Sequence, residues 1–143
     1  MAWTAKWYGK AFVAAFGATG LNLASGSVKA LLVSNAYTPD QDVHDFLDDV
    51  TGELSGGGYA RATLAGKAVS YDGATNTVKF TSNAFTFTAL TGTFRHCVLV
   101  VDSGVAGTSP LVVCFTSDAD VTASGQDVTF TPGSGGLVDV VVS

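Results

Sequence analysis

The chain has 143 residues, of which 47% are hydrophobic and 13% are charged, so it can form one domain with an ordinary core. Its 17 glycines against 3 prolines, together with many Thr, Val and Phe residues, favour short strands joined by turns. The formal net charge is -5, and no Lys or Arg follows Arg95. Because phosphate binding needs clustered Lys and Arg side chains, this pattern argues against a nucleic-acid partner.

The N-terminal segment is rich in aromatic residues. The spacing predicts a helix over residues 5–16, and we expect residues 1–20 to form a helix or arm ahead of a β domain at residues 21–143. Such an arm would suit docking on a partner. The aromatic candidates for that interface are Trp3, Trp7, Tyr8, Phe12 and Phe16.

The same segment has one feature of a targeting signal, because Lys6 and Lys10 precede the apolar stretch AFVAAFGA. That stretch is short, and Trp, Tyr and Gly precede it, which suits a docked helix or arm better than a secretory core. No run in the chain reaches the roughly 18 apolar residues that a membrane span requires. We therefore expect no membrane partner.

The segment from Tyr37 to Tyr59 holds half of the 12 acidic residues of the chain. Thr38 and Gln41 have the spacing of a capping box around Pro39. Apolar residues then follow at i, i+3, i+4 and i+7, which predicts a short amphipathic helix over residues 39–50. These residues are Val43, Phe46, Leu47 and Val50. Gly52 is placed to end the helix, and Gly56, Gly57 and Gly58 then form a loop.

The acidic residues of this segment are candidate ligands for a metal ion, since hard cations bind carboxylate oxygens. Their spacing does not match an EF-hand loop, although Asp42, Asp45 and Asp49 would share a face of the predicted helix. A solvated helix face with acids near its N-terminus explains them better. We predict no metal and no other cofactor.

Catalysis has little support in the sequence. His44 and His96 are the only histidines, and neither lies in a recognised catalytic motif. Strand alternation would place the side chains of His96 and its neighbour Cys97 on opposite faces, which disfavours a Cys-His pair. We therefore predict that the protein is not an enzyme.

The rest of the chain has the pattern of a β domain. Alternating or uniformly apolar runs predict strands, and a turn at Asp72-Gly73 and a loop at residues 102–109 join two hairpins. The predicted strands are 28–33, 59–64, 67–71, 78–81, 85–89, 94–101, 111–116, 126–131 and 137–142. The expected fold is mainly β: a single antiparallel sandwich or barrel-like domain with one or two short helices.

Three further side chains are candidates for an interface. Tyr37 and Tyr59 stand at the two ends of the acidic segment, and Arg61 follows closely. Aromatic and Arg side chains concentrate in binding hot spots. The alternative is that both tyrosines pack under the segment and that Arg61 pairs with one of its acids.

Two cysteines are predicted to lie close together. Pairing about the loop at 102–109 would place Cys97 almost opposite Cys114. A disulfide would need Cβ atoms within about 4 Å. Two small buried thiols are the other reading.

A pattern spread over most of the chain resembles a family of small virion structural proteins of tailed bacteriophages. It combines a Lys-containing apolar strand, a Tyr-Thr-Pro, His-Asp-Phe, Glu and Gly-Tyr succession, and a strand-turn-strand rich in Thr and Asn. The matching residues are Lys29, Tyr37, Thr38, Pro39, His44, Asp45, Phe46, Glu53, Gly58 and Tyr59. The resemblance continues through Ser109-Pro110-Leu111 and the C-terminal glycines.

The resemblance implies a non-enzymatic role on the virion, of the capsid decoration (cement), head-fibre or minor capsid type. A decoration protein would bind the outer surface of the major capsid protein, stabilise the head and act as a homo-oligomer, with a trimer favoured. It would be made in the host cytoplasm and reside on the capsid surface. The alternatives are a tail or head-fibre component that contacts the host surface or a glycan, and a hydrolase that uses His44 with an Asp.

Overall fold

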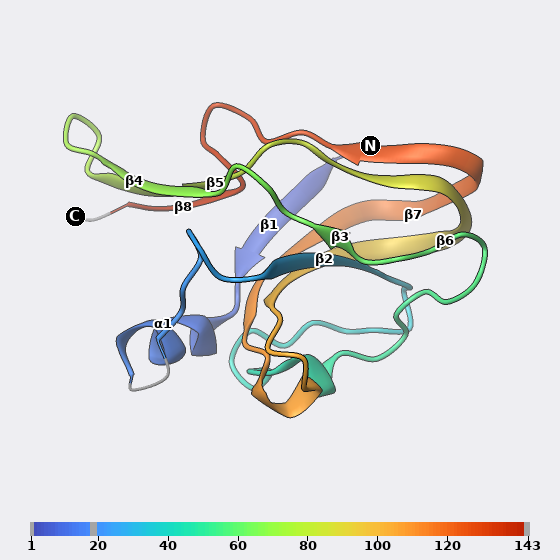
Figure 1. The fold of residues 1–143 in the computed structure, drawn as a ribbon, viewed down its shortest axis with the longest axis horizontal. Coiled ribbons are helices and arrows are strands. Elements are labelled where there is room, and N and C mark those ends of the chain that lie inside the picture. The colour runs from blue at the N-terminus through green and yellow to red at the C-terminus, as the bar shows by residue number, and fades with distance from the viewer. Residues whose placement is uncertain (1, 18–19, 142–143) are drawn as a thin grey trace.

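The computed structural model describes residues 2–17 and 20–141 of a mainly β protein, as the sequence predicts (Figure 1). Its strands are β1 (Trp3–Trp7), β2 (Val28–Val33), β3 (Ala62–Thr63), β4 (Ala68–Asp72), β5 (Thr77–Thr81), β6 (Phe85–Val101), β7 (Leu111–Phe130) and β8 (Val138–Val141). The described helices are α1 (Gly9–Phe16) and two short 3₁₀ turns, η1 (Leu47–Asp49) and η2 (Ala106–Thr108).

The strands form two antiparallel sheets. The larger sheet has the order β1-β7-β6-β2-β3, and the smaller has the order β4-β5-β8. In Figure 1 the small sheet projects from one end of the molecule, on the same side as α1. This arrangement agrees with the predicted sandwich-like domain.

The long hairpin of β6 and β7 makes the framework of the fold. Each strand was predicted as two separate strands, but each is continuous, with register shifts between Phe87 and Leu90 and between Phe94 and His96. Such irregularities bend a strand and increase its twist. The hairpin therefore curls over, as the curved ribbons of β6 and β7 show in Figure 1.

The large sheet carries a core cluster on each face. Ala30 and Leu32 of β2 belong to one cluster, and Leu31 and Val33 belong to the other. This division follows the alternation of side chains along a strand. The first cluster includes Phe80, Phe85, Phe87, Leu90 and Phe94, and the second includes Tyr8, Tyr37, Leu47 and Leu111.

The predicted N-terminal helix over residues 5–16 is wrong over residues 5–8 and right over residues 9–16. Residues 3–7 form β1, which pairs antiparallel with β7 from Trp3↔Ser117 to Trp7↔Val113. The helix begins only at Gly9, after Tyr8 in extended geometry. Hydrogen bonds to β7 satisfy the backbone groups of alternate residues in this segment, and local periodicity cannot reveal a partner so distant in the sequence.

The predicted helix over residues 39–50 is absent, and only the short turn η1 is helical. The side chain of Asp40 accepts hydrogen bonds from the amides of Asp42 (3.0 Å) and Val43 (3.1 Å). Asp49 accepts one from the amide of Asp45 (2.9 Å). Aspartate side chains that bond nearby amides compete with helical bonds, which explains the irregular path. Val43, expected in the core, is 64% exposed.

The two cysteines do not form a disulfide, and both are buried free thiols. The register pairs Val98 with Cys114 and Cys97 with Phe115. The offset of one residue sends the two thiols to opposite faces of the sheet. Cys97 accordingly lies in one core cluster and Cys114 in the other.

Candidate docking surface

Three of the predicted interface residues meet in an apolar groove between α1 and the small sheet. Trp7, Phe12 and Phe16 line it on the side of the helix, and the groove has a volume of about 410 Å³. The other lining residues are Ala11, Ala15, Leu21, Leu23, Val69, Val78, Phe80 and Val140. Every lining side chain is apolar.

The small sheet contributes a continuous apolar face to this groove. Its register places Val69 opposite Phe80, and Val78 opposite both Tyr71 and Val140. Opposite residues of paired strands point to the same face, so these side chains share one side of the sheet. The sequence indicated the helix side of the groove through its aromatic residues. The sheet side could not be predicted, because it depends on the pairing of β8 with β5, which are distant in the sequence.

Large apolar side chains remain exposed around the groove. Phe16 is 86% exposed, Tyr71 60% and Val69 49%. Phe16 is the last of a run of rings in which Trp7 and Phe12 lie 5.2 Å apart and Phe12 and Phe16 lie 6.5 Å apart. Contiguous exposed apolar surface of this kind marks interaction sites in soluble proteins.

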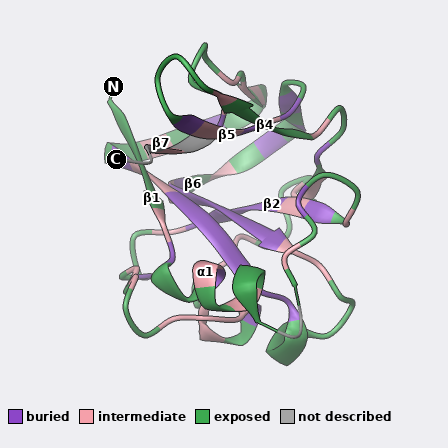
Figure 2. Ribbon diagram, turned by 90° about the vertical axis from the view of Figure 1, so that its left-hand side faces the viewer, coloured by how far each residue is buried: buried purple, intermediate pink, exposed green. Residues whose placement is uncertain are grey.

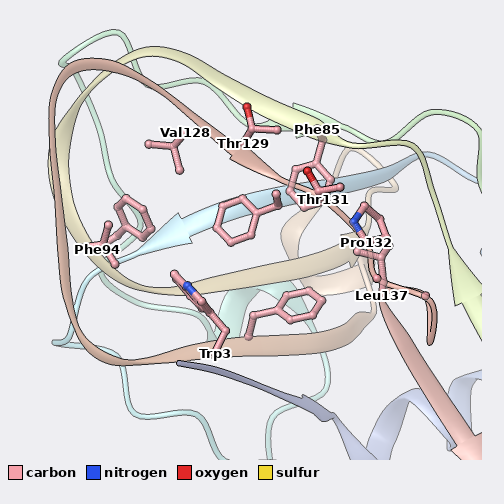
Figure 3. A pocket seen from close by; sticks show the side chains of 13 residues that line it. Trp3, Phe85, Phe94, Val128, Thr129, Thr131, Pro132 and Leu137 are labelled. Carbon is pink, nitrogen blue, oxygen red and sulfur yellow. The ribbon is translucent and has the colours of Figure 1, made fainter. Parts of the chain in front are cut away.

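Trp3 lies apart from this groove. Its ring is 37% exposed and packs against Phe130 (5.3 Å between centroids) and Phe94 (6.3 Å). Figure 3 shows Trp3 and Phe94 beside a second cavity that the curled hairpin encloses. The N-terminal aromatic residues therefore line two separate cavities on the same side of β1. Trp3 lines one, and Trp7, Phe12 and Phe16 line the other.

Tyr8 and Tyr37 are buried and cannot form a surface in this chain. Their hydroxyl groups lie 2.9 Å apart, and the Tyr37 hydroxyl also lies 2.9 Å from Nδ1 of His44. The ring of His96 meets that of Tyr37 edge-on at 5.8 Å. Burial raises the pKa of Tyr37 to about 12 and raises that of Tyr8 further. Tyr37 therefore packs under the acidic segment, the alternative offered by the sequence.

The structure also brings His96 close to Cys114, a pairing that sequence reasoning missed. Nδ1 of His96 lies 4.0 Å from Sγ of Cys114 and 2.9 Å from Oγ1 of Thr116. Register was the missing signal, because positions 96 and 98 share a face and Val98 pairs with Cys114. Burial lowers the pKa of His96 and raises that of Cys114, which is opposite to the shifts of an activated thiolate pair.

Tyr59 and Arg61 both bind Glu53. Tyr59 donates its hydroxyl to Oε1 (2.7 Å), and Arg61 binds Oε1 and Oε2 through Nε and Nη2 (both 2.7 Å). The ring of Tyr59 stacks on Phe87 at 6.1 Å. Arg61 thus pairs with an acid of the segment, although with one that follows the predicted helix. These contacts fasten the segment to the sheet.

The acidic side chains of the described residues are not grouped as ligands of a cation. Within residues 2–17 and 20–141, no group of three or more His, Cys, Asp or Glu side chains could hold a metal ion. The carboxylates of Asp40 and Asp49 are instead occupied by backbone amides.

Comparison with known proteins gives no family. The sequence matches no family model, no curated protein and no solved structure. Among the described residues, no helix is both long enough and apolar enough to cross a membrane.

Proposed function

We propose that the protein is a capsid decoration protein of a tailed bacteriophage that binds the outer surface of the major capsid protein and stabilises the head. The observation that supports this proposal is the open apolar groove between α1 and the small sheet, which we assign as the surface that attaches to the capsid. A partner that fills it would cover Phe16, Val69 and Tyr71, which are costly to leave in water. The resemblance to small virion proteins supplies the class of partner.

Many copies would act together on one particle. A shallow groove gives each copy modest affinity, but binding at several neighbouring sites multiplies the effect. A homo-oligomer, with a trimer favoured, would supply that multivalency around the symmetry axes of a capsid. The protein would then reside on the virion surface after synthesis in the host cytoplasm.

Point variants in the groove test this proposal better than removal of the N-terminal segment, which would also remove β1 from the sheet. Phe16→Ser and Val69→Ser alter exposed side chains, so the fold should survive. Val105→Ser is the matched control, because Val105 is 62% exposed but lies beside η2, outside the groove.

The assay is cosedimentation of each variant with purified heads that lack the protein. We expect the two groove variants to bind at least about tenfold more weakly, a loss of about 1.4 kcal/mol, and the control to bind like the unmodified protein. Unchanged occupancy by both groove variants would contradict the proposal.

One observation favours the alternative of a tail or head-fibre component. The acidic segment and the loop at residues 102–109 adjoin, since the amide of Leu47 donates to the carbonyl of Ser109 (2.9 Å). Together they would form the contact surface of such a component. Copy number separates the two roles: hundreds of copies per particle indicate a head protein, and a few to dozens indicate a tail or vertex protein.

A further inference from the structure

The outer edge of β1 has free backbone groups. The amide of Tyr8 donates to Val112 (3.1 Å), and Ala2 accepts from Asp118 (3.0 Å). In an antiparallel pair the residues that bond to the partner alternate with residues that face away. The even-numbered residues of β1 therefore bond to β7, and the N–H and C=O groups of Trp3 and Ala5 point outward.

Among the described residues, no strand pairs with the outer edge of β1. β1 is the terminal strand of its sheet, and Trp3, Thr4, Ala5 and Lys6 are all exposed. Figure 2 shows β1 at the margin of the molecule, largely coloured as exposed. An open edge of this kind is a template for another strand.

An aromatic hollow flanks the edge on one side. Trp3 and Phe94 line it (Figure 3), together with Phe115 and Phe130. Its volume is about 370 Å³. A strand added beside β1 would direct every second side chain toward this face. An apolar side chain suits that position.

A polar hollow of about 300 Å³ flanks the edge on the other side. It is lined by Thr4, Lys6, Pro39, Gln41, His96 and Thr116, with no carboxylate among them. Within the described chain Lys6 makes no ion pair, unlike Lys29, Arg61 and Arg95. The remaining side chains of an added strand would point here, where a carboxylate would meet the Lys6 ammonium.

We propose that β1 binds an extended segment of another protein as an added strand, with apolar side chains toward Trp3 and an acidic side chain toward Lys6. Backbone hydrogen bonds to Trp3 and Ala5 supply affinity, and the two hollows supply specificity. This binding site is distinct from the groove between α1 and the small sheet, and the proposal does not depend on the capsid role.

A second copy of the chain fits the edge less well. Strand β1 contains no acidic residue, so pairing two copies of it would bring two Lys6 side chains to one face without a carboxylate. Like charges on facing strands are destabilising. A lysine at a sheet edge discourages such self-pairing while still admitting an acidic strand.

The probe is the synthetic peptide acetyl-Thr-Val-Glu-Val-Thr-Val-amide, titrated into the full chain and followed by ¹H-¹⁵N NMR. We expect saturable shifts at the amides of Trp3 and Ala5. Ala5→Pro removes an outward N–H without removing a bond to β7, as edge strands tolerate, and should weaken binding at least about tenfold. Its thermal unfolding shows whether the fold is retained.

Charge exchange gives a second test that does not depend on the proline variant. Lys6→Glu should weaken binding of the Glu peptide at least about fivefold and should restore binding to a peptide with Lys in place of Glu. Three results would overturn the proposal: no binding by the unmodified protein at millimolar peptide, equal binding by folded Ala5→Pro, or dimerisation that Ala5→Pro abolishes.

Discussion

The hydroxyl groups of Tyr8 and Tyr37 lie 2.9 Å apart in the interior, although 29 positions separate them in the sequence. Nδ1 of His44 accepts a hydrogen bond from the backbone amide of Asp40 (3.2 Å), so this nitrogen carries no proton. Tyr37 therefore donates to His44 and accepts from Tyr8. This chain of bonds joins the residue that precedes α1 to the acidic segment.

Removal of either hydroxyl should weaken the fold. Tyr37→Phe loses both bonds and should lower the free energy of unfolding by about 1–3 kcal/mol, while Tyr8→Phe loses one bond and should cost about 1 kcal/mol. Urea denaturation of the two single variants and the double variant measures the coupling. Strictly additive effects would contradict a shared hydrogen bond.

Local signals predicted β2 and the hairpin of β4 and β5, because neighbouring residues determine both. The apolar run at residues 28–33 forms β2 with the same bounds, and the hairpin expected around Asp72-Gly73 forms as β4 and β5. In both places side-chain alternation and turn residues agree with the tertiary fold.

The failures arise where distant or competing contacts decide the structure. Residues 5–7 lie within the helix predicted over residues 5–16 but belong to β1, because they pair with the distant strand β7. The acidic segment has a helical apolar pattern, but Asp40 and Asp49 bond nearby amides instead. The groove was half predictable, since Phe12 and Phe16 mark one wall and the pairing of β5 with β8 makes the other.

Two adjacent glycines should differ sharply in their tolerance of a side chain. Gly57 has φ of 55°, and a Cβ there would collide with the carbonyl oxygen of Thr91, whereas Gly56 has φ of 69° and open space around it. Gly56→Ala should cost about 1–2 kcal/mol from the left-handed backbone alone. Gly57→Ala should cost about 1–3 kcal/mol more because of the clash. Equal urea midpoints for the two variants would contradict this account.

Glu53 should matter more to stability than Arg61. Arg61→Ala removes a partly exposed ion pair, whose Arg61 and Glu53 side chains are 33% and 26% exposed, and should cost about 1 kcal/mol or less. Glu53→Ala also leaves the half-buried Tyr59 hydroxyl without its acceptor, so it should cost about 1–3 kcal/mol. Thermal unfolding of both variants gives the order, and a larger effect at Arg61 would contradict it.

Neither cysteine should react in the native state. Both thiols are buried and unpaired, and burial raises the pKa of each. Titration with Ellman's reagent at pH 8 should detect no rapid reaction in the folded protein and two thiols after unfolding in guanidinium chloride. Rapid reaction of the folded chain, or a missing thiol in the unfolded chain, would contradict this assignment.

Stability should fall as the pH is lowered below neutrality. Burial lowers the pKa of His96 from the ordinary value of 6.5, so the unfolded chain binds a proton at this residue before the folded chain does. The stability contributed by the neutral His96 imidazole is therefore complete above the pKa of His96 in the unfolded chain. It is lost as the pH falls from that value to the lower pKa of His96 in the folded chain. Urea midpoints measured from pH 8 to pH 5 should show this loss. His96→Gln, which cannot titrate there, should reduce the slope. A midpoint that rises on acidification, or equal slopes for the two proteins, would contradict a buried neutral imidazole at His96.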